Sequence, residues 1–366
     1  MNVNYLDDND TDSEGAPNTK KICLVSEYAW NTPLQGTAAD NVYTDRGIQS
    51  TLTNVGLCYD ATVDANGYTT SNYEGMSFVY RLSDGSFMII DGGFPNEGNA
   101  DRLFNVLKKQ ANGGDIVIAA WIFTHDHEDH VGLFKTFSDK YHDQITIEKF
   151  LFNFPSSEQS TEGKASTYVT PIIAKYYKSA EVHKPHTGYV YYIRNATVTI
   201  LFALDAYEPL ALSGTMENTT LSCNYNCSSM IFQVAVNGVS TMFLGDCQDA
   251  EREALKDTYS ENVFKSDIVQ VAHHGIWGCG KGVYEDIGAT YTVVPLGADK
   301  MKTANTTWDS VLLSGDKMDN FNDYFVSNGS LKNNVYLSEN NVVIFTLNNG
   351  SVSVNQFDSV ESYLNG

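Results

Sequence analysis

Four side chains of the kinds that bind metal ions lie within six consecutive residues of this sequence. His125, His127, Asp129 and His130 follow an apolar run, and three of the eight histidines of the whole chain are among them. Imidazole and carboxylate ligands together suit zinc, and also manganese or iron. A solvated polar turn after a strand would explain polarity here, but not three histidines. The segment therefore predicts a metal centre, where a bound ion could activate water for hydrolysis.

The spacing of these four residues indicates two metal positions. Residues 119–124 are apolar, which is typical of a short strand buried in a parallel or mixed sheet. His125 and His127 are two residues apart, so in extended backbone they project to the same side and can share one metal. Asp129 and His130 follow where a helix is expected to begin. The change of direction there aims them at a second point nearby.

The motif resembles the His-x-His-x-Asp-His signature of the metallo-β-lactamase superfamily. Three further landmarks of that family follow in the expected order: an upstream hairpin that ends in Asp91-Gly92-Gly93, then Gly245-Asp246 and His273-His274-Gly275, each after an apolar strand. The resemblance covers residues 75–355. It implies an α/β fold, a four-layer αββα sandwich of two mixed sheets flanked by helices.

The resemblance also implies two divalent metal ions, with Zn²⁺ preferred and Mn²⁺ or Fe²⁺ as alternatives. Asp246 would bridge both ions, since a carboxylate has two oxygens. Either His273 or His274 would complete the second ion, and we favour His273 because it lies closer to the strand end. The predicted ligands are His125, His127, Asp129, His130, Asp246, His273 and the open candidate His186, and catalytic roles are predicted for Asp129, Asp246 and His274.

Many superfamily members place another histidine between the first motif and the bridging aspartate. The candidates in this chain are His142, His183 and His186. His142 lies in a polar stretch and has the surroundings of a surface residue, whereas His186 precedes an expected strand pair. His186 is therefore the better candidate. Competence-type relatives often lack this ligand, so the position stays open.

Around the later landmarks, the sequence resembles competence-protein-type domains and the phosphorylcholine esterases of bacterial surfaces more than the β-lactamases proper. This implies a metal-dependent hydrolase that uses a metal-bridging hydroxide on a phosphoester, such as phosphorylcholine on a surface polymer. A lactonase or other carboxylic ester hydrolase is the alternative, because the same hydroxide attacks carbonyls. A second alternative is a non-catalytic surface-binding protein on the same fold.

The charge and composition of the chain limit the classes of partner that we expect it to bind. The net charge is -22, from 45 acidic and 23 basic residues, and no cluster of Lys and Arg suggests a nucleic-acid groove. We therefore expect a small-molecule or cell-surface polymer substrate. No apolar run is long enough for a membrane helix. Residues 1–19 are acidic and apolar-poor, and a disordered tail of this kind often follows a removed secretion signal. The predicted location is extracellular or at a bacterial cell surface, with the cytoplasm as the alternative.

The sequence also predicts three segments with different roles. Residues 20–74 are expected to be an N-terminal extension that packs on the core, through edge strands or a flap. Residues 75–366 would form the catalytic domain, and residues 155–190 exceed a plain connection, which is typical of a substrate lid. Among the six cysteines, Cys223 and Cys227 could form a local disulfide in an exported protein. Cys247 is expected to be a small buried residue beside the site.

Overall fold

The structure is a computed structural model. It describes residues 41–57, 61–63, 69–71, 75–155, 162–204, 225–247, 255, 259–275, 278–279, 281–296, 326–327, 330–339 and 341–366. The expected acidic tail at residues 1–19 and the beginning of the expected extension at residues 20–74 lie outside these ranges. Cys223 also lies outside the described residues.

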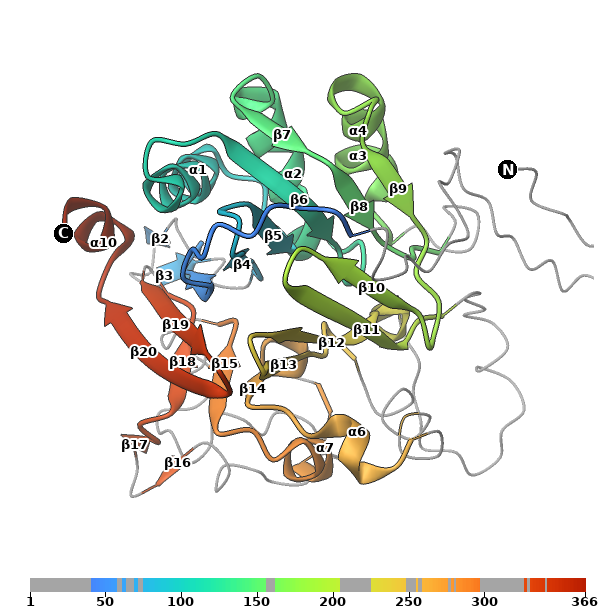
Figure 1. The fold of residues 1–366 in the computed structure, drawn as a ribbon, viewed down its shortest axis with the longest axis vertical. Coiled ribbons are helices and arrows are strands. Elements are labelled where there is room, and N and C mark those ends of the chain that lie inside the picture. Colours follow the sequence, from blue (N-terminus) through green and yellow to red (C-terminus); the bar gives the residue numbers. More distant parts are fainter. Residues whose placement is uncertain are drawn as a thin grey trace, which may run out of the picture.

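Two mixed β-sheets form the centre of the molecule (Figure 1). Within the described residues, the first sheet has nine strands in the order β20 (Ser351–Phe357), β19 (Val342–Asn348), β1 (Thr51–Val55), β4 (Phe78–Arg81), β5 (Phe87–Ile90), β6 (Ile116–Ile122), β8 (Lys149–Leu151) and β9 (Glu181–His183), with β7 (Ile145–Ile147) paired to β6. From β5 to β9 the pairs are parallel, and from β20 to β5 they are antiparallel.

The second sheet runs in the order β10 (Val190–Ile193), β11 (Ala196–Phe202), β12 (Ile231–Val236), β13 (Val239–Phe243), β14 (Ile268–Gln270), β15 (Tyr291–Val294) and β18 (Val335–Leu337). Its first four strands are antiparallel, and the pairs from β13 to β18 are parallel. Two short hairpins stand apart from both sheets: β2 (Ala61–Val63) with β3 (Thr69–Ser71), and β16 (Val326–Ser327) with β17 (Ser330–Leu331).

Helices cover the outer face of each sheet. On the first sheet these are α1 (Glu97–Ala111), α2 (Glu128–Tyr141), α3 (Ala165–Tyr168), α4 (Thr170–Tyr176) and α10 (Val360–Asn365), and on the second they are α6 (Glu261–Phe264) and α7 (Lys281–Ile287) (Figure 1). Two 3-10 turns, η2 (Tyr225–Ser228) and η3 (Ala272–Gly275), lie near strand ends. No helix among the described residues is long and apolar enough to cross a membrane.

The alternation of side chains along the strands produces the layers. Phe87 and Ile89 of β5 point toward the helices, whereas Met88 and Ile90 pack against the second sheet. The same period of two divides β12, where Phe232 faces the first sheet and Ile231 belongs to the core beneath α6 and α7. Three hydrophobic cores therefore separate four layers, in the αββα arrangement expected from the sequence.

Strand β1 differs from the sequence prediction. We expected the residues before position 75 to supply edge strands or a flap, but β1 is hydrogen-bonded to β4 on one side and to β19 on the other. Thr51–Val55 is therefore an internal strand of the sheet, and neither an edge strand nor a flap. Its partner β19 lies almost 300 residues later in the chain, as the pair Thr51 and Thr346 shows, and sequence periodicity carries no information on a pairing of that range.

The described part of the segment at residues 155–190 joins the first sheet. Ile172 and Ile173 of α4 and Val182 of β9 are buried in the core between the sheet and its helices, and β9 extends the sheet in parallel beyond β8. The turn at residues 162–165 lies next to the metal-type residues described below. A lid role for this segment remains a prediction.

Candidate metal centre

The predicted metal-type residues lie at the carboxyl ends of strands from both sheets. β6 ends at Ile122 and leads to His125, His127 and the first turn of α2. β13 leads to Asp246, and β14 leads through η3 to His273 and His274. Ligand sites of α/β proteins form at such ends because the loops that leave neighbouring strands converge there.

Close backbone contact brings the two sheet edges together. The Met230 N–H donates to the carbonyl of Thr124 at 2.8 Å, which joins the loop before β12 to the end of the β6 segment. Gly245 has a φ of +55°, and a Cβ at this position would lie 3.1 Å from the Cβ of Thr124. Glycine therefore gives the turn both its left-handed conformation and the closeness of the two edges.

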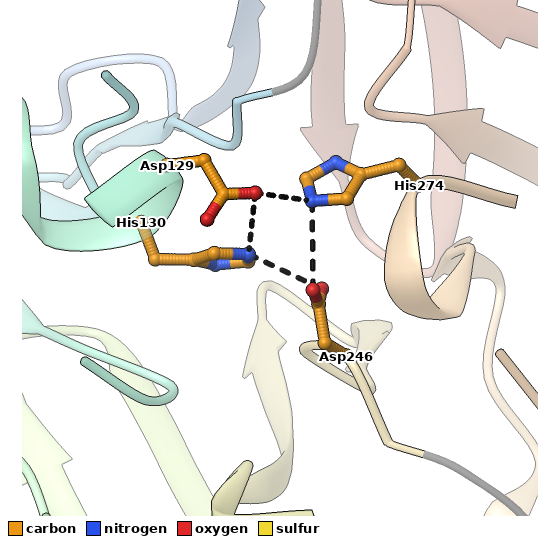
Figure 2. Close-up of side chains that lie close together, drawn as sticks. All are labelled: Asp129, His130, Asp246 and His274. Atoms are coloured by element: carbon orange, nitrogen blue, oxygen red, sulfur yellow. Dashed lines mark ion pairs between the residues drawn. The ribbon is translucent and has the colours of Figure 1, made fainter. Parts of the chain in front are cut away.

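Asp129, His130, Asp246 and His274 form one group, whose ligand-type atoms all lie within 4.8 Å of one another (Figure 2). His274 Nε2 is 3.0 Å from Asp129 Oδ2 and 3.5 Å from Asp246 Oδ2. On the opposite side, His130 Nε2 is 3.2 Å from Asp246 Oδ1. The four side chains point inward, two from the start of α2 and two from the second sheet.

His125, His127 and Asp246 form a second group by the same criterion. The two imidazoles meet with His125 Nε2 3.1 Å from His127 Nδ1, and His125 Nε2 lies 3.9 Å from Asp246 Oδ2. Asp246 therefore belongs to both groups. This is the arrangement in which one carboxylate can serve two cations.

Three buried atoms of the first group lack hydrogen bonds within the described part of the chain: His130 Nε2, His274 Nε2 and Asp246 Oδ1. The three side chains are at most 2% exposed. A buried polar atom left without a partner costs about 1–3 kcal/mol. Since these atoms converge and their nitrogen and oxygen donors suit zinc, manganese or iron, the group fits a divalent cation.

The electrostatics of the first group also favour positive charge. Burial opposes the charged form of His130, but the surrounding carboxylates, Asp246 foremost, raise the pKa of its imidazole to about 10. Burial likewise opposes ionisation of Asp246, yet the imidazoles of His130 and His274 hold the pKa of this carboxyl well below its ordinary value. The carboxylates of the first group therefore attract positive charge to this place.

Asp91 orients the His130 ring through the nitrogen that points away from the first group. Its Oδ2 lies 2.7 Å from His130 Nδ1, and its two oxygens accept from the N–H and the hydroxyl of Thr124 at 2.8 and 2.7 Å. A hydrogen bond at Nδ1 leaves Nε2 directed into the group. Sequence reasoning used Asp91-Gly92-Gly93 only as a family landmark and missed this role, although an acid directly after a strand was a signal for it.

Asp246 is positioned by Ser229 and Gln270, which sequence reasoning also missed. The Asp246 N–H donates to Ser229 Oγ at 3.0 Å. Gln270 Oε1 accepts from the N–H groups of Leu244 and Gly245 at 2.8 and 2.9 Å. A buried amide at the end of β14 therefore fixes the turn that carries the aspartate.

The two other carboxylates of the motif, Asp126 and Glu128, accept hydrogen bonds from residues outside it. Asp126 is buried and accepts from the Tyr225 hydroxyl at 2.5 Å and from the Ala165 N–H at 2.8 Å. Glu128 accepts from the hydroxyl of Tyr168. Both carboxylates anchor neighbouring segments to the loop between β6 and α2.

For His273 and His274 the geometry favours the opposite of our expectation, in which His273 was the metal ligand and His274 had a catalytic role. Both have left-handed backbone, with φ of +48° and +56°. His274 Nδ1 lies 2.8 Å from the carbonyl of Pro295, which directs Nε2 into the first group. His273 is in neither group; its Nε2 lies 3.7 Å from Asp246 Oδ2 and 3.3 Å from Asn226 Nδ2. The geometry thus favours His274 as the ligand.

The remaining histidines lie outside both groups. The ring of His186 contacts that of Tyr189, with centroids 5.1 Å apart. His183 pairs with Glu181 at 2.9 Å, and His142 stacks on Tyr176. The open candidacy of His186 as a ligand therefore receives no support from the geometry.

Comparisons with known proteins agree with this architecture. The sequence model of the metallo-beta-lactamase superfamily matches residues 72–201, which include the histidine motif but not Asp246 or His274. Residues 72–201 are therefore similar to the metallo-β-lactamase superfamily, whose members are mostly hydrolases. No curated protein matches the sequence.

Solved structures similar to the chain share little sequence with it. The metallo-beta-lactamase fold protein YhfI from Bacillus subtilis is 12% identical, with a TM-score of 0.37 over 67% of this chain and 85% of its own. A diphosphatase from the PhnP family is 13% identical, with a TM-score of 0.41 over 85% of this chain and 99% of its own. Zn²⁺-bound PqqB from Methylobacterium extorquens is 10% identical, with a TM-score of 0.38 over 61% of this chain and 72% of its own.

Proposed function

We propose that this protein is a metal-dependent hydrolase that cleaves phosphoesters, with phosphodiesters such as phosphorylcholine on a surface polymer as the substrate class. The observation that carries the proposal is the position of Asp246, whose carboxylate belongs to both metal-type groups. A carboxylate shared by two groups of nitrogen and oxygen donors is the arrangement that two-metal hydrolytic sites require.

Each group would hold one divalent ion. Asp129, His130, His274 and Asp246 of the first group would bind one ion, and His125, His127 and Asp246 of the second group would bind the other. When bound, such ions supply Lewis-acid activation of water and of the phosphoryl group. The choice of His274 over His273 as a ligand in the first group rests on the distances given above.

The protein itself contributes orientation and exclusion of water. Asp91 fixes the tautomer and direction of the His130 ring, and the complete burial of both side chains keeps bulk water from this side of the site. A dry surrounding strengthens the attraction between fixed charges and a developing negative charge.

Of the two neighbouring imidazoles after β14, His273 is the better placed to contact a substrate. Its side chain is 22% exposed, whereas that of His274 is 2% exposed. Asn226 holds its ring at the edge of the site, 3.3 Å from Nε2. We assign His273 to hydrogen bonding with a phosphoryl or leaving-group oxygen.

Hydrolysis of p-nitrophenyl phosphorylcholine by zinc- or manganese-loaded protein tests the proposal, beside p-nitrophenyl butyrate and a lactone. We expect phosphodiester turnover that Asp246→Asn abolishes. The matched control is Asp139→Asn, an exposed carboxylate that pairs with Lys135 at the surface of α2.

Three outcomes would contradict the proposal. Turnover that survives in Asp246→Asn would place the chemistry elsewhere. Turnover of the butyrate or the lactone alone would support a carboxylic ester hydrolase. Saturable binding of phosphorylcholine without turnover of any substrate would support a surface-binding protein.

A further inference from the structure

Two buried cysteines meet directly beside the metal centre. Cys247 follows Asp246 in the turn after β13, and Cys279 lies between η3 and α7. Their Sγ atoms are 2.6 Å apart, and both side chains are fully buried. Cys279 Sγ also lies 3.6 Å from the carbonyl oxygen of Cys247.

The turns that position the metal-type residues also bring the two sulfurs together. The Cys247 N–H donates to the carbonyl of Leu244 at 3.1 Å, which closes the turn around Asp246. After η3 the chain folds back so tightly that a Cβ on Gly278 would overlap the backbone of Ala272. Cys279 is thereby held against Cys247 by backbone, and not by flexible side chains.

The surroundings of the pair are apolar. Both cysteines belong to the core beneath the second sheet, together with Val271, Ala272 and Tyr284. The Sγ atoms would need only a small displacement to reach the ~2.05 Å of a disulfide bond.

We propose that Cys247 and Cys279 are a redox pair, which forms a disulfide when the protein folds in the presence of a disulfide oxidant such as oxidised glutathione. The thiolate of one cysteine attacks the oxidant, forms a mixed disulfide and releases one reduced glutathione. The second thiolate then attacks the protein sulfur of that mixed disulfide and releases the other. Two protein thiols are oxidised, and one glutathione disulfide is reduced.

The bond would tie the segment that carries Asp246 to the segment that follows His274. It closes a loop between two strand ends of the second sheet, so it would restrict the unfolded chain and hold the turn in place. The inference rests on the two sulfurs alone and is independent of the proposed function.

Peptide mapping of the full-length chain tests the pair. The protein is refolded in a mixture of reduced and oxidised glutathione, alkylated with N-ethylmaleimide in denaturant, digested without reductant and analysed by mass spectrometry. We expect one linked peptide pair that contains Cys247 and Cys279 and lacks two hydrogens. Refolding in the oxidant removes any barrier from burial of the thiols. Complete alkylation of both cysteines, or a link from either to another cysteine, would overturn the proposal.

Variants give a second readout. Cys247→Ala and Cys279→Ala should each abolish the link and leave the partner thiol alkylated, whereas Cys227→Ala, which changes another buried cysteine, should keep it. Reduction should lower the Tm of the wild-type protein by about 4 °C and leave that of the double variant unchanged. An equal shift in both proteins would count against the disulfide.

Discussion

Asp91 Oδ2 and His130 Nδ1 lie 2.7 Å apart, and both side chains are completely buried. Asp91 itself has a left-handed backbone, with a φ of +54°. A non-glycine residue in this region is strained, and such strain is kept only where the surrounding structure demands it. The pair therefore links the end of β5 to the start of α2 at the point where the candidate ligands begin.

Replacement of Asp91 should weaken metal binding without removing a ligand. Asp91→Asn removes the negative charge that makes the His130 imidazole a stronger donor, and loss of such a partner lowers metal affinity about 10- to 100-fold. Titration with Zn²⁺ against a chromophoric chelator measures the effect. Asp267→Asn is the control, because Asp267 also accepts from backbone, at Ser240 N, but lies outside both groups. Equal affinities of Asp91→Asn and wild type would contradict the assigned role.

The two neighbouring histidines should differ in what their loss removes. His274→Ala deletes a donor of the first group and should lower the metal content after dialysis from two ions toward one. His273→Ala should retain both ions and reduce phosphodiester turnover by about 100-fold, the effect of losing one donor to a developing charge. Metal analysis and turnover of the same samples separate the two. The reverse pattern would restore His273 as the ligand.

The Tyr225 hydroxyl should matter to stability because its acceptor is a buried carboxylate. Tyr225→Phe removes a 2.5 Å hydrogen bond to Asp126, and we expect a loss of about 1.5–3 kcal/mol in the free energy of unfolding. Tyr177→Phe is the matched variant, since its hydroxyl donates to the neutral Ser138 Oγ at 3.1 Å and should cost about 1 kcal/mol. Urea unfolding measures both. Equal losses would show that the charge of Asp126 is unimportant.

Gly245 should tolerate no side chain. Gly245→Ala places a Cβ 3.0 Å from Ser229 in a backbone with φ of +55°, so conformational strain and crowding add to about 2–4 kcal/mol of lost stability. Gly47→Ala measures the conformational strain alone, because Gly47 has a φ of +65° and nothing within 4 Å of an added Cβ. Its expected loss is about 1–2 kcal/mol. Identical unfolding free energies for the two variants would refute the crowding at Gly245.

The local part of the site follows from the sequence. His125 and His127 fall in one metal-type group, and α2 begins at Glu128, where the change of direction was expected. Asp129 and His130 consequently join a different group from His125 and His127. Each of these results depends on backbone within a few residues, which periodicity describes well.

The features of the site and fold that depend on residues far apart in the chain could not be predicted from the sequence in this way. The choice between His273 and His274 depends on two successive left-handed residues and on a contact with Pro295. Tyr225, which donates a hydrogen bond to Asp126, is 99 residues away from it in the sequence. Nothing near strand β1 in the sequence reveals that it pairs with β19. Neither pairing has a local pattern, so only the folded chain shows them.

The first group draws Asp129 and His130 from the helix that covers one sheet, and Asp246 and His274 from loops of the other (Figure 2). A cation held by all four residues would therefore be a cross-link between the two halves of the sandwich. Each half would then be held to the other by coordination bonds as well as by the core between the sheets. In such a protein the free metal concentration sets the free energy that opposes separation of the sheets, since an ion that binds only the folded chain stabilises it by mass action. Metal supply would thus govern the lifetime of the protein as well as its chemistry.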